Sequence, residues 1–171
     1  MPTAIRVRSL ILVAAAVVLT ASAASAIGPL QFYSVTPCRV VDTRWQPPGI
    51  NRAPSLVNFG TRSFQITGLC GVPSTAKAAS VNVTIATPTH TGYLIVYPYN
   101  LARPLVSNIN WAGGEEALAN GAITPLTSGS LNVSVFSELY GAPNGGGSVN
   151  VILDVTGYFD CPPGTNLATC Q

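Results

Sequence analysis

Short stretches in which hydrophobic and polar residues alternate recur along this chain between residues 31 and 160. The clearest are S-V-N-V-T-I-A, which begins at Ser80, and S-V-N-V-I-L-D-V, which begins at Ser148. Successive side chains of a strand point to opposite faces, so a period of two predicts strands that bury one face. Gly, Pro and Asn separate the stretches, and no segment after residue 26 has a convincing helical period. We therefore predict a single all-β domain, an antiparallel β-sandwich or jelly roll of about nine strands.

The nine predicted strands cover Q-F-Y-S-V, C-R-V-V-D-T, R-S-F-Q-I-T, S-V-N-V-T-I-A-T, G-Y-L-I-V-Y-P-Y, S-N-I-N-W, L-A-N-G-A-I-T-P-L, S-L-N-V-S-V-F and S-V-N-V-I-L-D-V-T-G-Y-F. Three of them share the phrase Ser-Val/Leu-Asn-Val. Alternation along these three places their aliphatic side chains on one face. The predicted core is Val81, Val83, Ile85, Leu131, Val133, Val135, Val149, Val151 and Leu153.

Asn82, Asn132 and Asn150 are predicted to share the face opposite this core. Asparagine is depleted in strands, so three occurrences need an explanation. Their amides could bond to the backbone or to one another beneath a loop, which is the interpretation that we favour. The alternative is a polar face that holds a ligand.

The stretch G-Y-L-I-V-Y-P-Y-N contains the strongest binding signal in the chain. Alternation puts Tyr93, Tyr97 and Tyr99 on one side of a strand, with Leu94 and Val96 on the other. The tyrosines could form an exposed platform on which sugar rings stack. The interpretation that we favour is that they cover an edge of the sandwich or line its second inner face.

The first 26 residues have the pattern of a secretory signal peptide. Arg6 and Arg8 precede a short apolar run, and Ala24-Ser25-Ala26 fits a small-x-small cleavage site. We predict a signal peptide at 1–26, a β-sandwich domain at 27–160 and a disulfide-closed tail at 161–171. No later apolar run is long enough to span a bilayer, so we expect a secreted or cell-surface protein without a membrane anchor after cleavage.

Four cysteines in an exported chain predict two disulfides, for which three connectivities are possible. We favour Cys38–Cys70, which would tie the first strands together, and Cys161–Cys170, which would close the tail. A zinc site needs tighter Cys and His pairs, and His90 is the only histidine. We predict no metal and no cofactor.

Charged residues make up only 8% of the chain, against about a quarter in ordinary soluble domains. Without Arg6 and Arg8, the remaining Lys and Arg equal the six Asp and Glu in number. No basic patch is present for nucleic acid or for anionic lipid. A weakly charged surface also lacks the lysines that protect strand edges, so self-association is a second possibility.

The stretch P-C-R-V-V-D-T-R concentrates three of these few charges. We predict that Arg39, Asp42 and Arg44 form a structural ion-pair knot with Asp154, because the planar guanidinium binds carboxylates through two bonds at once. A calcium site at Asp42 and Asp154 is the alternative, which the neighbouring arginines oppose.

Catalytic arrangements are weakly supported. His90 lies in a predicted turn, and no serine occupies a G-x-S-x-G motif. Glu115 and Glu116 are adjacent, and either could pair with Glu138 as in a glycosidase, although the spacing does not indicate this. We therefore expect no enzymatic activity, with a secreted hydrolase as the third and least favoured possibility.

The order of T-P-C-R-V-V-D-T-R, C-G-V-P, S-V-N-V-T-I-A-T-P-T-H-T-G-Y-L-I-V-Y-P, S-N-I-N-W and V-I-L-D-V-T-G-Y-F resembles an uncharacterised β-rich module of exported bacterial proteins. The resemblance covers about Tyr33 to Phe159. It implies an accessory or surface domain and supplies no catalytic residues. Together with the tyrosine-rich strand, it leads us to expect recognition of cell-envelope or extracellular polysaccharide, with a self-associating structural or adhesive protein as the alternative.

Overall fold

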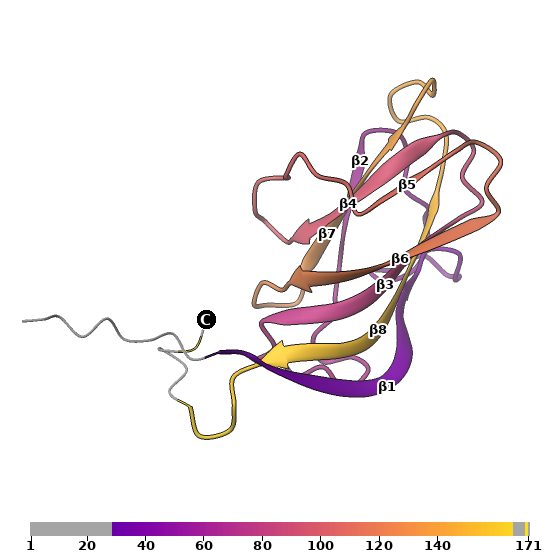
Figure 1. The fold of residues 1–171 in the computed structure, drawn as a ribbon. Helices are drawn as coiled ribbons and strands as arrows, with labels where there is room; N and C mark the ends of the chain where they lie inside the picture. Colours follow the sequence, from indigo (N-terminus) through magenta and orange to yellow (C-terminus); the bar gives the residue numbers. More distant parts are fainter. Residues whose placement is uncertain (1–28, 166–169, 171) are drawn as a thin grey trace, which may run out of the picture.

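The computed structural model describes residues 29–165 and residue 170. In this part of the chain eight strands form two antiparallel sheets of four strands each, and no helix is present (Figure 1). The predicted all-β class is therefore confirmed. The strands are β1 Gln31–Asp42, β2 Gly60–Phe64, β3 Ala78–Ala86, β4 Gly92–Pro98, β5 Ile109–Trp111, β6 Ala117–Pro125, β7 Val133–Leu139 and β8 Asn150–Asp160.

One sheet has the strand order β1-β8-β3-β6 and the other the order β2-β7-β4-β5. The first strand thus pairs with the last, the second with the seventh, the third with the sixth and the fourth with the fifth. Every connection except that between β4 and β5 passes from one sheet to the other. The strands therefore form one long hairpin folded over itself, and residues 99–108 are its tip.

The two sheets enclose one hydrophobic core to which both contribute side chains. Val83 and Ile85 of β3 are fully buried there with Leu94 of β4, as the alternating pattern predicts. Each such aliphatic side chain stabilises the fold by about 1.5–3 kcal/mol through its removal from water. All the predicted core residues belong to this cluster except Leu131, which precedes β7 and is half-buried.

The prediction of nine strands is wrong by one, because the first two predicted strands are parts of the single strand β1. The pairing of β1 with β8 is interrupted between Ser34 and Cys38, and Pro37 lies in this interruption. Proline has no N–H to donate to the ladder, so the register shifts around it. The strand then resumes in the same sheet, which a sequence pattern broken by proline does not reveal.

Two glycines in the repeated phrase Thr-Gly-Tyr have a steric reason. A Cβ atom at Gly92 would collide with the carbonyl oxygen of Glu138 on the neighbouring strand, and one at Gly157 would collide with the ring of Phe32. Close approach of a neighbouring strand or ring is a common reason for glycine inside a strand. The phrase therefore marks two places where neighbouring groups come unusually close.

Two disulfides join Cys38 to Cys70 and Cys161 to Cys170, with Cα–Cα distances of 5.7 and 5.9 Å. These are the pairings that the sequence analysis favours. The predicted signal peptide and residues 166–169 and 171 of the tail lie outside the described residues. Within the described part, no helix has the length and apolar character needed to cross a bilayer.

The connection between β1 and β2, residues 43–59, is held by polar side chains that bond to the backbone. Asn51 donates its Nδ2 to the carbonyls of Val40 and Gln65, at 2.9 and 2.8 Å. Arg62 donates to the carbonyl oxygens of three residues of this connection, and its burial lowers its pKa. These carbonyls are those of Gly49, Ile50 and Pro54. The connection is therefore a fixed part of the fold.

Candidate functional site

The four residues of the predicted ion-pair knot lie together where β1 ends beside β8. Arg39 faces Asp154 in the β1–β8 register and binds its carboxylate through two bonds, Nε–Oδ1 at 2.8 Å and Nη2–Oδ2 at 3.1 Å. Arg44 binds Asp42 in the same way, at 2.9 and 2.7 Å. A weaker contact of 3.3 Å between Arg39 and Asp42 links the two pairs.

The carboxylate of Asp42 is the buried centre of this knot, with 0% of its side chain exposed. The side-chain hydrogen bonds from Arg44 lower the pKa of Asp42, and the backbone N–H of Arg44 adds a further bond. In return, Asp154 raises the pKa of Arg39, and Asp42 raises that of Arg44. The chain's own groups therefore hold these charges in place, which matches a structural role.

Two of the three predicted asparagines, Asn82 and Asn150, share the face of their sheet opposite the core, and Asn132 does not. Asn132 is buried in the connection before β7, where its Oδ1 accepts the N–H groups of Ile66 and Thr67 at 2.7 and 2.8 Å. Asn150 begins β8 and accepts the hydroxyl of Ser55 at 2.7 Å. Asn82 lies on β3, beside Asp154. Asn132 joins two loops and Asn150 fastens a loop to a strand, because an amide can replace a missing backbone partner.

The tyrosines of β4 lie on the face that points away from the core. Leu94 and Val96 enter the core, whereas Ile95 and Tyr97 form a second, smaller cluster with Phe136 of β7. Tyr93 packs against this cluster and is half-buried. The strand alternation is therefore as predicted, but Tyr97 is buried, and no open platform is formed.

The tip of the hairpin, residues 99–108, folds back over this outer face. The guanidinium Cζ of Arg103 lies 3.6 Å from the ring centroid of Phe136. At the end of the tip, Asn108 accepts the N–H of Val96 through its Oδ1 at 2.6 Å and donates its own N–H to the carbonyl of Leu94 at 2.9 Å. Tyr99 donates its N–H to the carbonyl of Asn132, which ties it to another loop.

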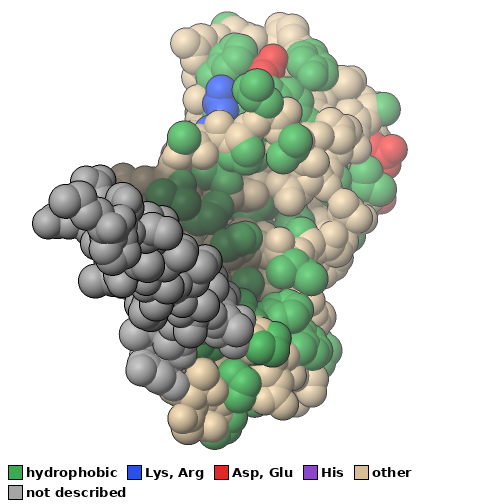
Figure 2. Space-filling model, turned by 60° about the vertical axis from the view of Figure 1, so that its left-hand side comes forward, with side chains coloured by type: hydrophobic (Ala, Val, Ile, Leu, Met, Phe, Trp, Pro, Cys, Tyr) green, Lys and Arg blue, Asp and Glu red, His purple; other side chains and the backbone are tan. Residues whose placement is uncertain are grey.

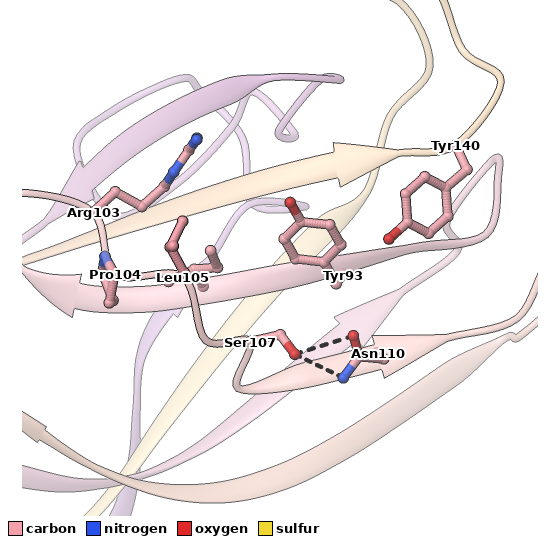
Figure 3. A pocket seen from close by; sticks show the side chains of 8 residues that line it. Tyr93, Arg103, Pro104, Leu105, Ser107, Asn110 and Tyr140 are labelled. Atoms are coloured by element: carbon pink, nitrogen blue, oxygen red, sulfur yellow. Dashed lines mark hydrogen bonds between the residues drawn. The ribbon is translucent and has the colours of Figure 1, made fainter.

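Between this tip and the sheet lies an open cavity of about 250 Å³. Figure 3 shows Tyr93 and Tyr140 on one side, Arg103 and Leu105 on the other, and the Ser107–Asn110 pair along the lower edge. We call this cavity the tip pocket; its lining residues are Tyr93, Ile95, Arg103, Pro104, Leu105, Ser107, Asn110 and Tyr140. It combines two aromatic rings with hydroxyl, amide and guanidinium groups.

The strand register explains how the pocket floor is assembled. Tyr93 on β4 faces Glu138 on β7 and Asn110 on β5, so the three side chains form one row across the sheet. Directly opposite side chains of neighbouring strands are in contact distance. The amide of Asn110 donates to the hydroxyl of Ser107 at 2.8 Å, which fixes the polar edge of the pocket.

The hydroxyl of Tyr93 donates to the carboxylate Oε2 of Glu138 at 2.5 Å. This hydrogen bond raises the pKa of Tyr93 to about 12, with smaller contributions from burial and from the negative charge of Glu138. The hydroxyl hydrogen of Tyr93 is therefore already donated to Glu138. Its oxygen remains available as an acceptor for a ligand hydroxyl.

Tyr140 and Leu105 form the exposed rim of the tip pocket. Tyr140 is 55% exposed, and its ring centroid lies 6.0 Å from that of Tyr93. Leu105 is 98% exposed at the outermost part of the tip. An aromatic face open to solvent beside a polar edge is a common feature of sites that bind amphipathic rings.

The residues considered for catalysis belong to different connections and strands of the fold. His90 belongs to the connection between β3 and β4, where its Nδ1 is 2.8 Å from the hydroxyl of Thr89. Glu115 and Glu116 are exposed in the turn before β6, and Glu138 is bonded to Tyr93. Among residues 29–165 and 170, no three His, Cys, Asp or Glu side chains come together in a group that could hold a metal ion.

Among the residues that line the tip pocket, only Tyr93 is predicted from the sequence to bind a ligand. Tyr97 and Tyr99 do not line the pocket, and Arg103, Tyr140, Ser107 and Asn110 are not predicted. The scarcity of charge was a usable signal, because it makes Arg103 as conspicuous as the arginines of the knot. The return of the tip onto the sheet is a tertiary feature that no periodic pattern reports.

The surface around these features carries few charges. Figure 2 shows one face of the molecule, on which hydrophobic side chains and uncharged polar groups surround a few blue and red atoms. A ligand would therefore meet mainly apolar and neutral polar groups on this face. Comparison with models of known protein families, with curated proteins and with solved structures finds no match to this chain.

Proposed function

We propose that this chain is an exported, non-catalytic module of the jelly-roll class that recognises extracellular or cell-envelope glycans. The jelly-roll class is supported by the pairing of first with last, second with seventh, third with sixth and fourth with fifth strands across two sheets. Export is supported by the pattern of residues 1–26 and by two disulfides, which persist in oxidising compartments.

The tip pocket is the observation that carries the glycan proposal. A sugar ring has an apolar face of C–H groups and a rim of hydroxyls. Tyr93 and Tyr140 offer aromatic surface, while the Ser107–Asn110 pair offers donors and acceptors beside it. The pocket is small and open, so it suits one ring of a polymer whose neighbouring units continue into solvent.

The proposal is tested by retention on immobilised polysaccharides, with wild type compared with Tyr140→Ala. Tyr140 is exposed, so its loss leaves the fold intact and removes one wall of the pocket. Trp45→Ala is the matched control, because Trp45 is also an exposed aromatic residue beside an arginine, 5.5 Å from Arg52. We expect Tyr140→Ala to lose retention and Trp45→Ala to keep it. Loss with Trp45→Ala alone, or no retention of wild type on any polymer, would refute the proposal.

A second function, self-association, is favoured by strand β6. It lies at the edge of its sheet, is nine residues long and contains no charged residue. Ile123 on this strand is 64% exposed. Unprotected edge strands of this kind pair readily with other chains. If copies associate through β6, light scattering will show concentration-dependent oligomers that Ile123→Lys abolishes, while the control Ile50→Lys on the β1–β2 connection leaves them unchanged.

A further inference from the structure

Arg103 is the one charged side chain among the residues that line the tip pocket. Its guanidinium lies over the ring of Phe136, with Cζ 3.6 Å from the ring centroid. Stacking on an aromatic ring stabilises a cation and restricts its position, but leaves the N–H groups at the edge of the guanidinium plane unused. The N–H groups of the Arg103 guanidinium are thus held in place at the pocket.

The other arginines that shape this molecule bind groups of the chain itself. Arg39 and Arg44 bind carboxylates, and Arg62 binds backbone carbonyls. The ion pairs of the described residues involve Arg39 and Arg44, and none involves Arg103. In this respect Arg103 differs from the arginines that have a structural role.

Glu138, the acidic residue of the same cross-strand row, forms no ion pair with Arg103. Its carboxylate accepts the hydroxyl of Tyr93 instead. The pocket therefore presents a positioned cation, an acceptor oxygen on Tyr93 and the hydroxyl–amide pair of Ser107 and Asn110. One cation balances one negative charge, and the two oxygens of a carboxylate match two N–H groups of a guanidinium.

We propose, resting on the proposed glycan function, that the ligand of the tip pocket is an acidic sugar, a hexuronate unit whose carboxylate binds Arg103. The sugar ring lies against Tyr140 and Tyr93, and its hydroxyls meet the Tyr93 oxygen and the Ser107–Asn110 pair. Recognition combines one charge-assisted contact with ring stacking, so it selects acidic over neutral polymers.

The test compares binding to polygalacturonate and to its methyl-esterified form, which has the same backbone without the negative charge. Wild type binds polygalacturonate at least about tenfold more tightly than the ester, because a hydrogen bond to a charged carboxylate is stronger than one to a neutral ester. Arg103→Gln removes this difference, and Arg103→Lys restores only part of it, since an ammonium lacks the planar fork. Arg52→Gln, an exposed arginine over Trp45, is the control and leaves the difference unchanged.

The outcomes separate this inference from the function on which it rests. Equal binding to both polymers, or a preference that survives Arg103→Gln, overturns the acidic-sugar inference and leaves glycan recognition standing. Tighter binding to poly(glycerol phosphate) that requires Arg103 overturns the carboxylate in favour of a phosphodiester. Absence of binding to any of these and to neutral polysaccharides overturns both.

Discussion

The ion-pair knot and the tip pocket both depend on arginine, in opposite ways. In the knot, Arg39 and Arg44 are each bound through two bonds by a carboxylate of the same chain. In the tip pocket, the guanidinium of Arg103 stacks on the ring of Phe136 and has no ion-pair partner in the described residues. The ion pairs of the knot hold the end of β1 against β8, whereas the guanidinium of Arg103 in the pocket can still bind an anion.

The comparison shows that the scarcity of charge does not by itself identify a functional site. Both regions stand out in a chain that is only 8% charged. What distinguishes them is whether the chain itself satisfies the charge. A buried carboxylate with two arginine partners is part of the architecture, and a stacked arginine without a carboxylate is available to a ligand.

The largest expected effect is on the stability of the knot. Asp42→Asn keeps the size of the side chain but removes the charge that binds Arg39 and Arg44. We expect a loss of about 2–3 kcal/mol in the free energy of unfolding, less than for a fully buried pair, because both guanidinium groups are partly exposed and regain water. Urea unfolding followed by circular dichroism measures it.

Asp154→Asn is the matched control for this change, since Asp154 binds Arg39 nearer the surface. Its cost is about 1 kcal/mol or less, as for exposed ion pairs. Folded Asp42→Asn protein also binds glycans as wild type does. An equal cost for both variants, or a glycan-binding defect in Asp42→Asn, would contradict the division between knot and pocket.

The ion-pair knot should also affect how the free energy of unfolding changes at acid pH. The pKa of Asp42 is lowered in the folded protein, so its contribution is present above the unfolded value of about 3.9 and is lost as the pH falls through the folded pKa. As the pH falls below about 4, the free energy of unfolding therefore decreases more for wild type than for Asp42→Asn. Parallel curves of unfolding free energy against pH for the two proteins would be inconsistent with this assignment.

A smaller effect is expected when the pocket arginine is removed. Arg103→Gln lowers the unfolding free energy by no more than about 1 kcal/mol, the contribution of a solvent-exposed cation that stacks on an aromatic ring. The change separates binding from stability, because the same variant removes the preference for acidic glycans. A loss as large as that of Asp42→Asn would show that Arg103 is a structural residue like those of the knot.

The smallest effect is spectroscopic. Because Glu138 raises the pKa of Tyr93 to about 12, one of the six tyrosines ionises later than an ordinary tyrosine with a pKa of about 10. Its contribution to stability is present below about pH 10 and is lost as the pH rises through about 12. Alkaline titration of tyrosinate absorbance should show this late step in wild type, and Glu138→Gln should shift it to lower pH. A titration that is identical in the two proteins would show that Glu138 does not hold the hydroxyl of Tyr93.

Much of the fold could be predicted, because strand alternation depends on local sequence. The aliphatic residues of S-V-N-V-T-I-A fill the core as their spacing predicts, and the four knot residues meet because Arg39 and Asp154 share a register position. Both follow from the period of two and from the pairing of opposite charges. Continuity of β1 across Pro37 was missed, since proline normally ends a strand pattern.

The candidate site was less predictable, because a loop that folds over a sheet builds it. Alternation assigns Tyr93 and Tyr97 to one face, but it cannot report that Tyr97 is buried beside Phe136 while Tyr93 lies at a pocket. Arg103 and Phe136 are far apart in the sequence and in no periodic relation. Similarly, the shared Ser-Val/Leu-Asn-Val phrase does not reveal that Asn132 is used inside a loop while Asn82 lies on a strand.

The location of the ligand is tested most directly by amide NMR spectra recorded as a galacturonate oligosaccharide is added. We expect shifts concentrated at residues 93, 103–110 and 138–140, around the tip pocket, with little change at residues 38–45 and 154 of the knot. Shifts centred on the knot, or an unchanged spectrum at saturating oligosaccharide, would contradict it.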